Sequence, residues 1–535
     1  MTRIARFSDS FDHRIRKISR SKRHATSCPV LIVCASLFFC MVPDSAFTVV
    51  QVLPRMRGID ANESDIPDFR VNERIGDRST ALGAPALAVD REGRFVIVWQ
   101  DVRADEGGDI FVQCYYSDGT PRGDNVRVND DSGVGVQKEP AVACHEDGSF
   151  IVVWQDGRDL SDASDVYAQR YSSDGTTVGA NFKVNEDEKH EWQGSPSVSC
   201  DGIGNFVIAW RDKRDQGFHV YAQRYSEDGV PVGSNFLVKD EGVGDYPPSV
   251  DCDSDGNFVI TWSAKRYSGY AVLAKLYWSD GSPAGNNFEV HLDERGDSHP
   301  DVTMFEPDGF VLAWEDTKHS DRTDIYAQLY SRNARPIGDN VRVNHAGDTT
   351  AQLKPSVASN DSGDFVIAWA DRRTDDDIRL YAQRMTYAGS RIGVNFPLSS
   401  DYRRWQNDPD IALLDDRLYA TWVESAPDGS GFDIWAHVVA LDAGTTRPTS
   451  SVLYQNWPNP FNLNTEICFD LSHAGTTTLK IFDLSGREVA TLISEFLNSG
   501  RHRTEWEADG LASGVYIYRL HCGSTVETRK MILLR

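Results

Sequence analysis

The sequence lacks the short motifs that mark most familiar catalytic and metal sites. It contains no Gly-x-Ser-x-Gly nucleophile turn, no His-Glu-x-x-His zinc motif and no phosphate-binding loop. Its nine cysteines form no Cys-x-x-Cys pair and no Cys/His spacing of a metal site. We therefore predict that the chain is not an enzyme and that it needs no cofactor.

The chain also lacks a long apolar run and an excess of positive charge. Its longest N-terminal apolar stretch is Pro29–Val42, whereas a membrane-spanning helix needs about 20 residues. Eight Lys and Arg precede that stretch, so residues 1–46 are predicted to be a signal peptide, followed by a linker at 47–64. We expect no transmembrane segment in the mature protein. The net charge of −25 argues against nucleic acid as a partner.

The sequence is rich in one repeated unit. A tryptophan closes an apolar run in each copy, at spacings of 52 to 56 residues: Trp99, Trp154, Trp210, Trp262, Trp314, Trp369 and Trp422. Each copy has four short strand-like segments and no helical periodicity, which is typical of a propeller blade. The predicted fold is all-β, with a seven-bladed β-propeller over residues 65–440.

The short strand around Phe69–Asn72 precedes the first tryptophan, and no equivalent follows Trp422. We predict that this N-terminal strand completes the last blade and so removes an exposed sheet edge. The alternative is that each blade is continuous and the ring closes by packing alone.

The pattern Trp-x-Asp-x-Arg occurs in full in several copies, for example at Trp154, Asp156 and Arg158. We interpret it as structural, with the Asp satisfying turn amides and pairing with the Arg. The functional alternative is a ring of ion pairs around a ligand. A residue repeated around a ring cannot by itself mark one catalytic point.

One turn resembles the start of a calcium-binding loop. Asp251, Asp253 and Asp255 alternate and are followed by Gly256, but Trp262 stands where such a loop needs a Glu. The segment is therefore either a hairpin turn or a Ca²⁺ site.

The loops before each proline-containing segment vary most between copies, and we expect them on one face of the ring. Aromatic and amide side chains in them suit stacking and hydrogen bonding to an extracellular glycan or protein. The alternative is that the aromatics pack between blades. The predicted ligand residues are Trp192, Gln193, Tyr246, Trp405 and Gln406.

After a predicted linker at 441–451, residues 452–535 contain alternating short strands that suit a small Ig-like sandwich. The runs Tyr454–Phe461, Leu479–Val489, Leu511–Tyr518 and Thr528–Arg535 resemble the type A C-terminal sorting domain of the bacterial type IX secretion system, which is related to the Ig-like module of flagellar hook-capping proteins. The resemblance implies recognition by the type IX machinery and a secreted or outer cell-surface location. The residues that carry it are Pro458, Asn459, Pro460, Phe461, Asp483, Gly486, Arg487, Gly514, Tyr516 and Lys530. We expect Asp483 and Gly486 to shape a hairpin turn, and Gly514 to allow a close approach.

The sequence thus predicts a secreted or cell-surface binding or adhesion protein, acting as a monomer. The first alternative is an extracellular propeller glycoside hydrolase, which needs two carboxylates across one pocket; none stands apart from the repeat with a matching partner. The second alternative is a passive surface-layer component.

Overall fold

The computed structural model describes residues 65–73, 81–103, 108–131, 135–158, 163–186, 191–214, 217–239, 246–266, 269–293, 299–305, 309–317, 323–345, 350–361, 363–374, 377–399, 404–426, 429, 431–441, 451–456, 459–471, 475–497, 500–508, 510–523 and 525–534. Every regular element in these residues is a β-strand. They include no helix with the length and hydropathy that crossing a bilayer requires. The predicted signal peptide (1–46), the linker at 47–64 and most of the linker at 441–451 lie outside the described residues.

Residues 66–440 form repeated antiparallel sheets of four strands. After β1 (Ile66–Arg70), the chain order is β2 (Ala81–Val89), β3 (Phe95–Asp101), β4 (Asp109–Tyr115) and β5 (Val126–Arg127); β6 (Gln137–Cys144), β7 (Phe150–Asp156), β8 (Asp165–Tyr171) and β9 (Thr177–Lys183); β10 (Gln193–Cys200), β11 (Phe206–Asp212), β12 (His219–Tyr225) and β13 (Pro231–Leu237); β14 (Ser249–Cys252), β15 (Phe258–Arg266), β16 (Gly269–Tyr277) and β17 (Phe288–Asp293). It continues with β18 (Asp301–Phe305), β19 (Gly309–Asp316), β20 (Asp324–Ser331) and β21 (Pro336–Arg342); β22 (Gln352–Ser359), β23 (Phe365–Thr374), β24 (Asp377–Met385) and β25 (Arg391–Pro397); and β26 (Gln406–Leu414), β27 (Arg417–Ser425) and β28 (Phe432–Ala440).

The first strand of each sheet packs against the first strand of the next, and we call these the inner strands. In contact order they are β2, β6, β10, β14, β18, β22 and β26, and β26 contacts β2 again. The contacts thus run from the last inner strand back to the first. The arrangement is a β-propeller-like all-β fold.

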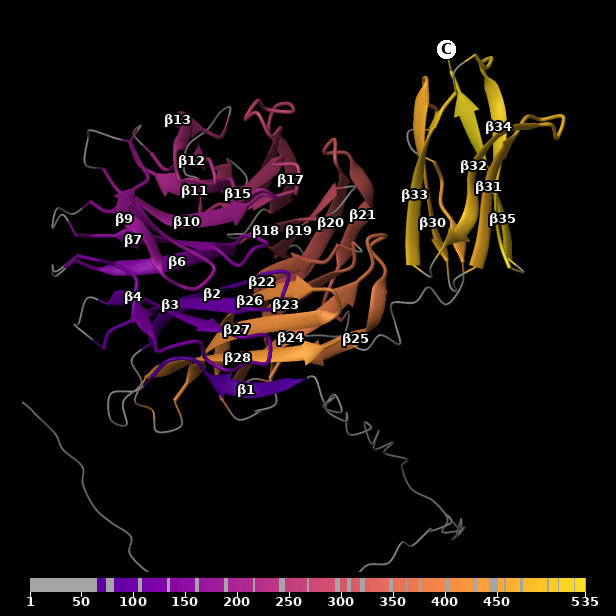
Figure 1. Ribbon diagram of the computed structural model, residues 1–535. Coiled ribbons are helices and arrows are strands. Elements are labelled where there is room, and N and C mark those ends of the chain that lie inside the picture. The colour runs from indigo at the N-terminus through magenta and orange to yellow at the C-terminus, as the bar shows by residue number, and fades with distance from the viewer. Residues whose placement is uncertain are drawn as a thin grey trace, which may run out of the picture. The chain divides into compact units, whose positions relative to one another are not determined.

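The last sheet takes its fourth strand from the N-terminal end of the described chain. β1 pairs antiparallel with β28, and the indigo β1 lies beside the orange β28 in Figure 1. Asn72 accepts the Ile434 backbone N–H at 2.8 Å and donates to Asp433 at 3.3 Å. Asn129 makes the same two bonds to Ile110 and Asp109 within a continuous sheet. The predicted closure by the N-terminal strand is confirmed.

The repeated tryptophans are fully buried, with exposed fractions of 0%. The indole N–H of Trp154 donates to Asp156 at 2.7 Å, and Asp156 also accepts the backbone N–H and the guanidinium of Arg158, both at 2.8 Å. The structural interpretation of Trp-x-Asp-x-Arg therefore holds, and the indole bond adds a reason for it that the sequence did not reveal. Trp262, whose copy has Ala264 in place of the Asp, keeps an indole N–H without a hydrogen-bond partner.

The C-terminal region forms two antiparallel sheets. One contains β29 (Val452–Leu453), β30 (Asn464–Leu471) and β33 (Gly500–Glu507); the other has the order β32 (Glu488–Leu497), β31 (Gly475–Phe482), β34 (Gly514–Cys522) and β35 (Thr525–Leu533). Alternate residues of β34, such as Tyr516, Tyr518 and Leu520, enter a shared apolar core.

Candidate functional site

A cavity of about 570 Å³ opens where the inner strands begin, and we call it the inner-strand cavity. Each inner strand, or the residue just before it, contributes to its wall. Small-molecule sites commonly have volumes of about 300–1,000 Å³. The cavity is therefore large enough to hold part of a ligand.

Each inner strand has a proline at or near its start, and the residue before it differs between copies. We call these preceding residues the rim: Ala84, Glu139, Ser195, Pro247, His299, Lys354 and Asp408. Five of them have a left-handed backbone with φ between 30° and 53°: Glu139, Ser195, His299, Lys354 and Asp408.

Left-handed backbone costs a non-glycine residue on the order of 1–3 kcal/mol, and a following proline restricts the residue further. The strand pairing shifts at these positions, for example between Lys138 and Ala141 and between Asn407 and Asp410. The fold thus keeps one strained bulge in most copies while the projected side chain changes. Variable side chains on a fixed scaffold are typical of a binding surface.

The charged rim side chains are matched by neighbours. Lys354 forms an ion pair with Asp408, and the Ser195 hydroxyl donates to Glu139 at 2.8 Å. His299 Nδ1 lies 3.3 Å from a carboxylate oxygen of Glu315. The rim therefore presents polar groups with little unbalanced charge.

An aromatic cluster borders the cavity at β10 to β16. The guanidinium carbon of Arg211 lies 3.6 Å from the ring centroid of Phe218. It is also 5.3 Å from the Tyr246 ring and 5.7 Å from the Trp192 ring. Tyr246, which lines the cavity, packs edge-on against Tyr270 at 5.4 Å, with their hydroxyls 3.3 Å apart. We call these five residues the aromatic cluster.

Gln155 links this cluster to the rim. In the amide orientation that satisfies its neighbours, its oxygen accepts the Trp192 indole N–H at 3.2 Å and its nitrogen donates to Glu139 at 3.1 Å. The Trp192 ring is therefore held beside the rim by a hydrogen bond as well as by packing.

The structure separates the five predicted ligand residues. Trp192 and Tyr246 belong to the aromatic cluster. Gln193 is fully buried and accepts from Asn185 at 3.1 Å, and Gln406 is buried and donates to Ser399 and Glu424. Because these amides bond within the protein, the two glutamines are not part of the site. Trp405 is half-buried against Phe432, at a centroid distance of 5.4 Å.

The predicted calcium loop is a turn closed by arginine. Asp253 accepts the Asn257 backbone N–H at 2.8 Å, and Arg332 contacts both Asp253 and Asp255. In the part of the chain that the structure describes, no group of three or more His, Cys, Asp or Glu side chains could hold a metal ion. The geometry therefore gives the Ca²⁺ interpretation no support.

Asp251 instead belongs to a set of carboxyls that join neighbouring inner strands. Each accepts a backbone N–H from the next inner strand at 2.7–2.8 Å; the pairs are Asp251 with Met304, Asp301 with Val357, and Asp410 with Leu87. Burial raises the pKa of Asp251 to about 6 and that of Asp410 to about 7, and it also raises the pKa of Asp301. The nearby charge of Asp301 adds to the shift of Asp410.

Asp301 and Asp410 also line the inner-strand cavity. The residue after the repeated proline is a carboxyl in these two copies alone; the set is Ala86, Ala141, Ser197, Ser249, Asp301, Ser356 and Asp410. Aligning the copies on the proline, rather than on the tryptophan, would have found this break in the repeat. Chemically, Asp410 can hold and release a proton near neutral pH at the wall of a cavity, beside a second carboxyl, Asp301, whose pKa burial also raises.

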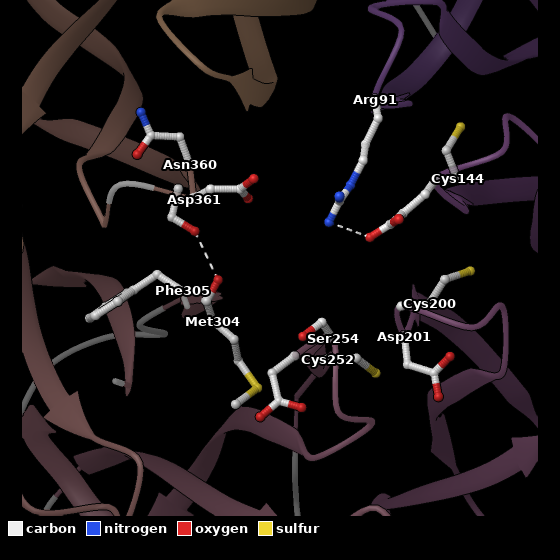
Figure 2. Close-up of a pocket in the computed structure, with 14 residues that line it drawn as sticks. Arg91, Cys144, Cys200, Asp201, Cys252, Ser254, Met304, Phe305, Asn360 and Asp361 are labelled. Carbon is white, nitrogen blue, oxygen red and sulfur yellow. Dashed lines mark hydrogen bonds and ion pairs between the residues drawn. The ribbon is translucent and has the colours of Figure 1, made fainter. Parts of the chain in front are cut away.

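A second cavity, of about 210 Å³, lies where the inner strands end. Arg91 forms an ion pair with Glu146 there, and Figure 2 shows the thiols of Cys144 and Cys200 turned away from the middle of the cavity. Burial raises the pKa of both thiols, so they are protonated at neutral pH. This cavity offers little chemistry and is not the candidate site.

In the C-terminal region, Asp483 and Gly486 form the turn between β31 and β32. Asp483 accepts the backbone N–H groups of Ser485 and Arg487, and Gly486 has φ of 83°. Asn459 accepts the Ile532 N–H at 2.8 Å, and Phe461 is buried in the core.

Of the remaining sorting residues, Gly514 and Tyr516 lie on β34 and Lys530 on β35 of the same sheet. Tyr516 donates to the Ala512 carbonyl at 2.9 Å, and Lys530 is exposed. A Cβ at Gly514 would meet only the Ala512 oxygen, at 3.9 Å, so the expected close approach is absent there. Pro460 is described, whereas Pro458 lies outside the described residues.

Residues 455–534 match the secretion system C-terminal sorting domain. The C-terminal region is thus a type IX sorting domain, which implies export and a secreted or cell-surface location. No curated protein sequence matches the chain.

Several solved structures are similar to the chain at low identity. A protein of unknown function from Dyadobacter fermentans is 10% identical with a TM-score of 0.43, covering 70% of this chain and 98% of that one. A Penicillium chrysogenum α-L-arabinanase complexed with arabinobiose is 10% identical with a TM-score of 0.43, covering 71% and 99%. An ulvan lyase bound to -[GlcA(1-4)Rha3S]- is 9% identical with a TM-score of 0.43, covering 69% and 96%. These likenesses identify no substrate for this chain.

The prediction that the chain is not an enzyme is wrong. The similar structures include polysaccharide lyases, an arabinanase and an arabinofuranosidase, all of which are enzymes.

Proposed function

We propose that residues 65–440 form a closed seven-bladed propeller that binds an extracellular glycan at the inner-strand cavity, and that the protein reaches the cell exterior through its sorting domain. A signal peptide at 1–46 and an Ig-like fold for residues 452–535 complete the proposal. The linkers are then 47–64 and 441–451.

The observation that carries the binding role is the aromatic cluster beside the cavity. Half-buried Trp192 and Tyr246 combine an apolar ring with a polar group, which suits a surface that contacts sugar rings. The rim adds hydrogen-bonding side chains whose direction is fixed by strained backbone. A passive surface-layer component would not need strained backbone that fixes the direction of these side chains.

The test is glycan binding by the purified full chain, with Tyr246→Ala and Trp192→Ala as site variants. The matched control is Tyr116→Ala, since Tyr116 is 49% exposed in the turn after β4, at the other end of the sheets. We expect the site variants to lose affinity by about tenfold and the control to keep it. Equal affinity in all three variants would contradict binding at this cavity, and no binding to any glycan would favour the passive role.

A second candidate function is hydrolysis of extracellular glycans. The observation that favours it is the pair of cavity carboxyls, Asp301 and Asp410, which break the repeat and have raised pKa values. Release of reducing sugar from a bound glycan, abolished by Asp410→Asn while binding persists, would support it. Bound glycan without release would leave the binding role alone.

Export is tested separately by removing residues 452–535. The shortened chain should stay inside the outer membrane, whereas the full chain should appear outside it. Appearance of both outside would contradict the assigned route.

A further inference from the structure

We propose that the ligand of the inner-strand cavity is an uncharged oligosaccharide, whose sugars stack on Trp192 and Tyr246 and whose end enters the cavity. This inference rests on the proposed function, glycan binding at the same cavity. It concerns the chemical class of the glycan, which that function leaves open.

The first argument is the charge balance at the rim. An anionic sugar needs a cation that can turn toward it, such as a lysine or a bidentate arginine. Lys354 is already paired with Asp408, and Glu315 faces His299 at 3.3 Å. Turning Lys354 from Asp408 toward the ligand would leave that rim carboxylate uncompensated.

The second argument is the position of Arg211. Its guanidinium carbon lies 3.6 Å from the Phe218 centroid and within 6 Å of two further rings, so the cation is spread against aromatic faces. Arg211 therefore stiffens the aromatic cluster, and its role is to hold the Trp192 and Tyr246 rings in place.

The third argument is electrostatic repulsion. The cavity wall contains Asp301 and Asp410, so an ionised sugar in the cavity would oppose the loss of their protons and, once they are ionised, would be repelled by them. The whole chain has a net charge of −25, which repels polyanions before contact. An uncharged sugar meets neither of these two unfavourable interactions.

The fourth argument is the distribution of side chains around the opening. The aromatic cluster occupies the side of β10 and β14, and the wall beyond it has small side chains, with Ala141 on β6 and Ala84 and Ala86 on β2. An extended chain can therefore lie from the aromatic rings along this side of the cavity. Ser195 and Glu139 beside the rings are placed to bond sugar hydroxyls.

The experiment measures binding of the full chain to three sets of soluble polysaccharides: neutral, uronate-bearing or sulfated, and amine-bearing. We expect binding to a neutral member, weakened about tenfold by Tyr246→Ala but not by Tyr116→Ala. Its affinity should change less than about twofold between low and high salt, because no ion pair forms.

Each other result decides against one of the two proposals. Tyr246-dependent binding to a charged polysaccharide, falling steeply with salt, would overturn the uncharged ligand and keep the cavity as the binding site. Binding that no cluster variant weakens, or none at all, would overturn the cavity itself. The conservative variant Tyr246→Phe keeps the ring and should retain most of the affinity, which separates stacking from misfolding.

Discussion

The backbone N–H of Leu87 donates to Oδ2 of Asp410 at 2.7 Å, so the first and last inner strands are joined by a titratable side chain. Asp410 also accepts from the Ser356 hydroxyl at 3.2 Å, which extends the contact to a third inner strand. The seam at which the repeat closes on itself thus depends on the protonation state of one residue.

The first prediction concerns the pH dependence of stability. The pKa of Asp410 is raised to about 7 in the folded protein, whereas an unfolded chain has the ordinary value near 4. Between about pH 4 and about pH 7 the folded protein therefore keeps a proton on Asp410 that the unfolded chain has lost. The stabilisation that this proton provides is complete below about pH 4 and is lost as the pH rises through about 7. The free energy of unfolding of the parent protein should fall by about 2 kcal/mol between pH 5 and pH 8, and we expect this fall to be absent in Asp410→Asn.

Thermal unfolding of both proteins at the two pH values measures this effect. Asp251 and Asp301 shift in the same direction and are present in both proteins, so the difference reports Asp410 together with its coupling to Asp301. An identical pH dependence in the variant would show that Asp410 titrates normally.

The second prediction uses the buried tryptophans. Asp156→Ala would leave the Trp154 indole without its acceptor and the Arg158 guanidinium with Asp130 as its remaining ion-pair partner, and should cost about 2–4 kcal/mol. The reverse change, Ala264→Asp, restores the full pattern Trp262, Asp, Arg266 and should stabilise by about 1 kcal/mol. Urea denaturation of the two variants gives both values. A lower urea midpoint for Ala264→Asp than for the parent protein would mean that the missing hydrogen-bond partner of the Trp262 indole does not limit stability.

The third prediction tests the closure by β1. Asn72→Ala leaves the Ile434 N–H without its side-chain acceptor, at a cost of about 2 kcal/mol. Asn129→Ala removes the same contacts in a continuous sheet and serves as the matched control. Equal losses by calorimetry would mean that β1 is as firmly docked as an ordinary strand. If Asn72→Ala leaves the stability unchanged while Asn129→Ala lowers it, the closure of the last sheet by β1 is contradicted.

The fourth prediction addresses the strain at the rim. Glu139 has φ of 53°, a conformation that glycine adopts without cost. Glu139→Gly should therefore be more stable than Glu139→Ala by about 1 kcal/mol, since both lose the same side chain. Both should bind glycan more weakly than the parent. Equal stability of the two variants would show that the bulge holds no strain.

Much of the architecture could be predicted from the sequence because each copy of the sequence repeat forms one structural unit. The tryptophan spacing follows from one buried indole in each sheet. The additional strand before Trp99 has no sheet of its own in the repeat, so it was predicted to complete the last sheet, where it pairs with β28. The Trp-x-Asp-x-Arg pattern was assigned a structural role for the same reason, since its repetition excluded a single site.

The candidate site was harder to predict because its residues become neighbours only when the ring forms. Trp192, Phe218 and Tyr246 precede three different strands, β10, β12 and β14, and Arg211 lies on β11, so nothing in their local sequence links them. Gln193 looked available because it stands next to Trp192, yet adjacent residues in a strand point to opposite faces, and Gln193 is buried. Asp251 failed as a calcium ligand because its partner, the Met304 amide, is on another strand.

The distance along the chain between β1 and its partner governs the order of assembly. Asp68 contacts His437 at 2.8 Å although they are 369 residues apart, so loop closure of that length must precede the contact. During synthesis β1 is made first, and it can pair only after β28 has followed. Circular permutation that carries β1 to the end of the repeat would turn this last step into a local one, and such a chain should fold faster.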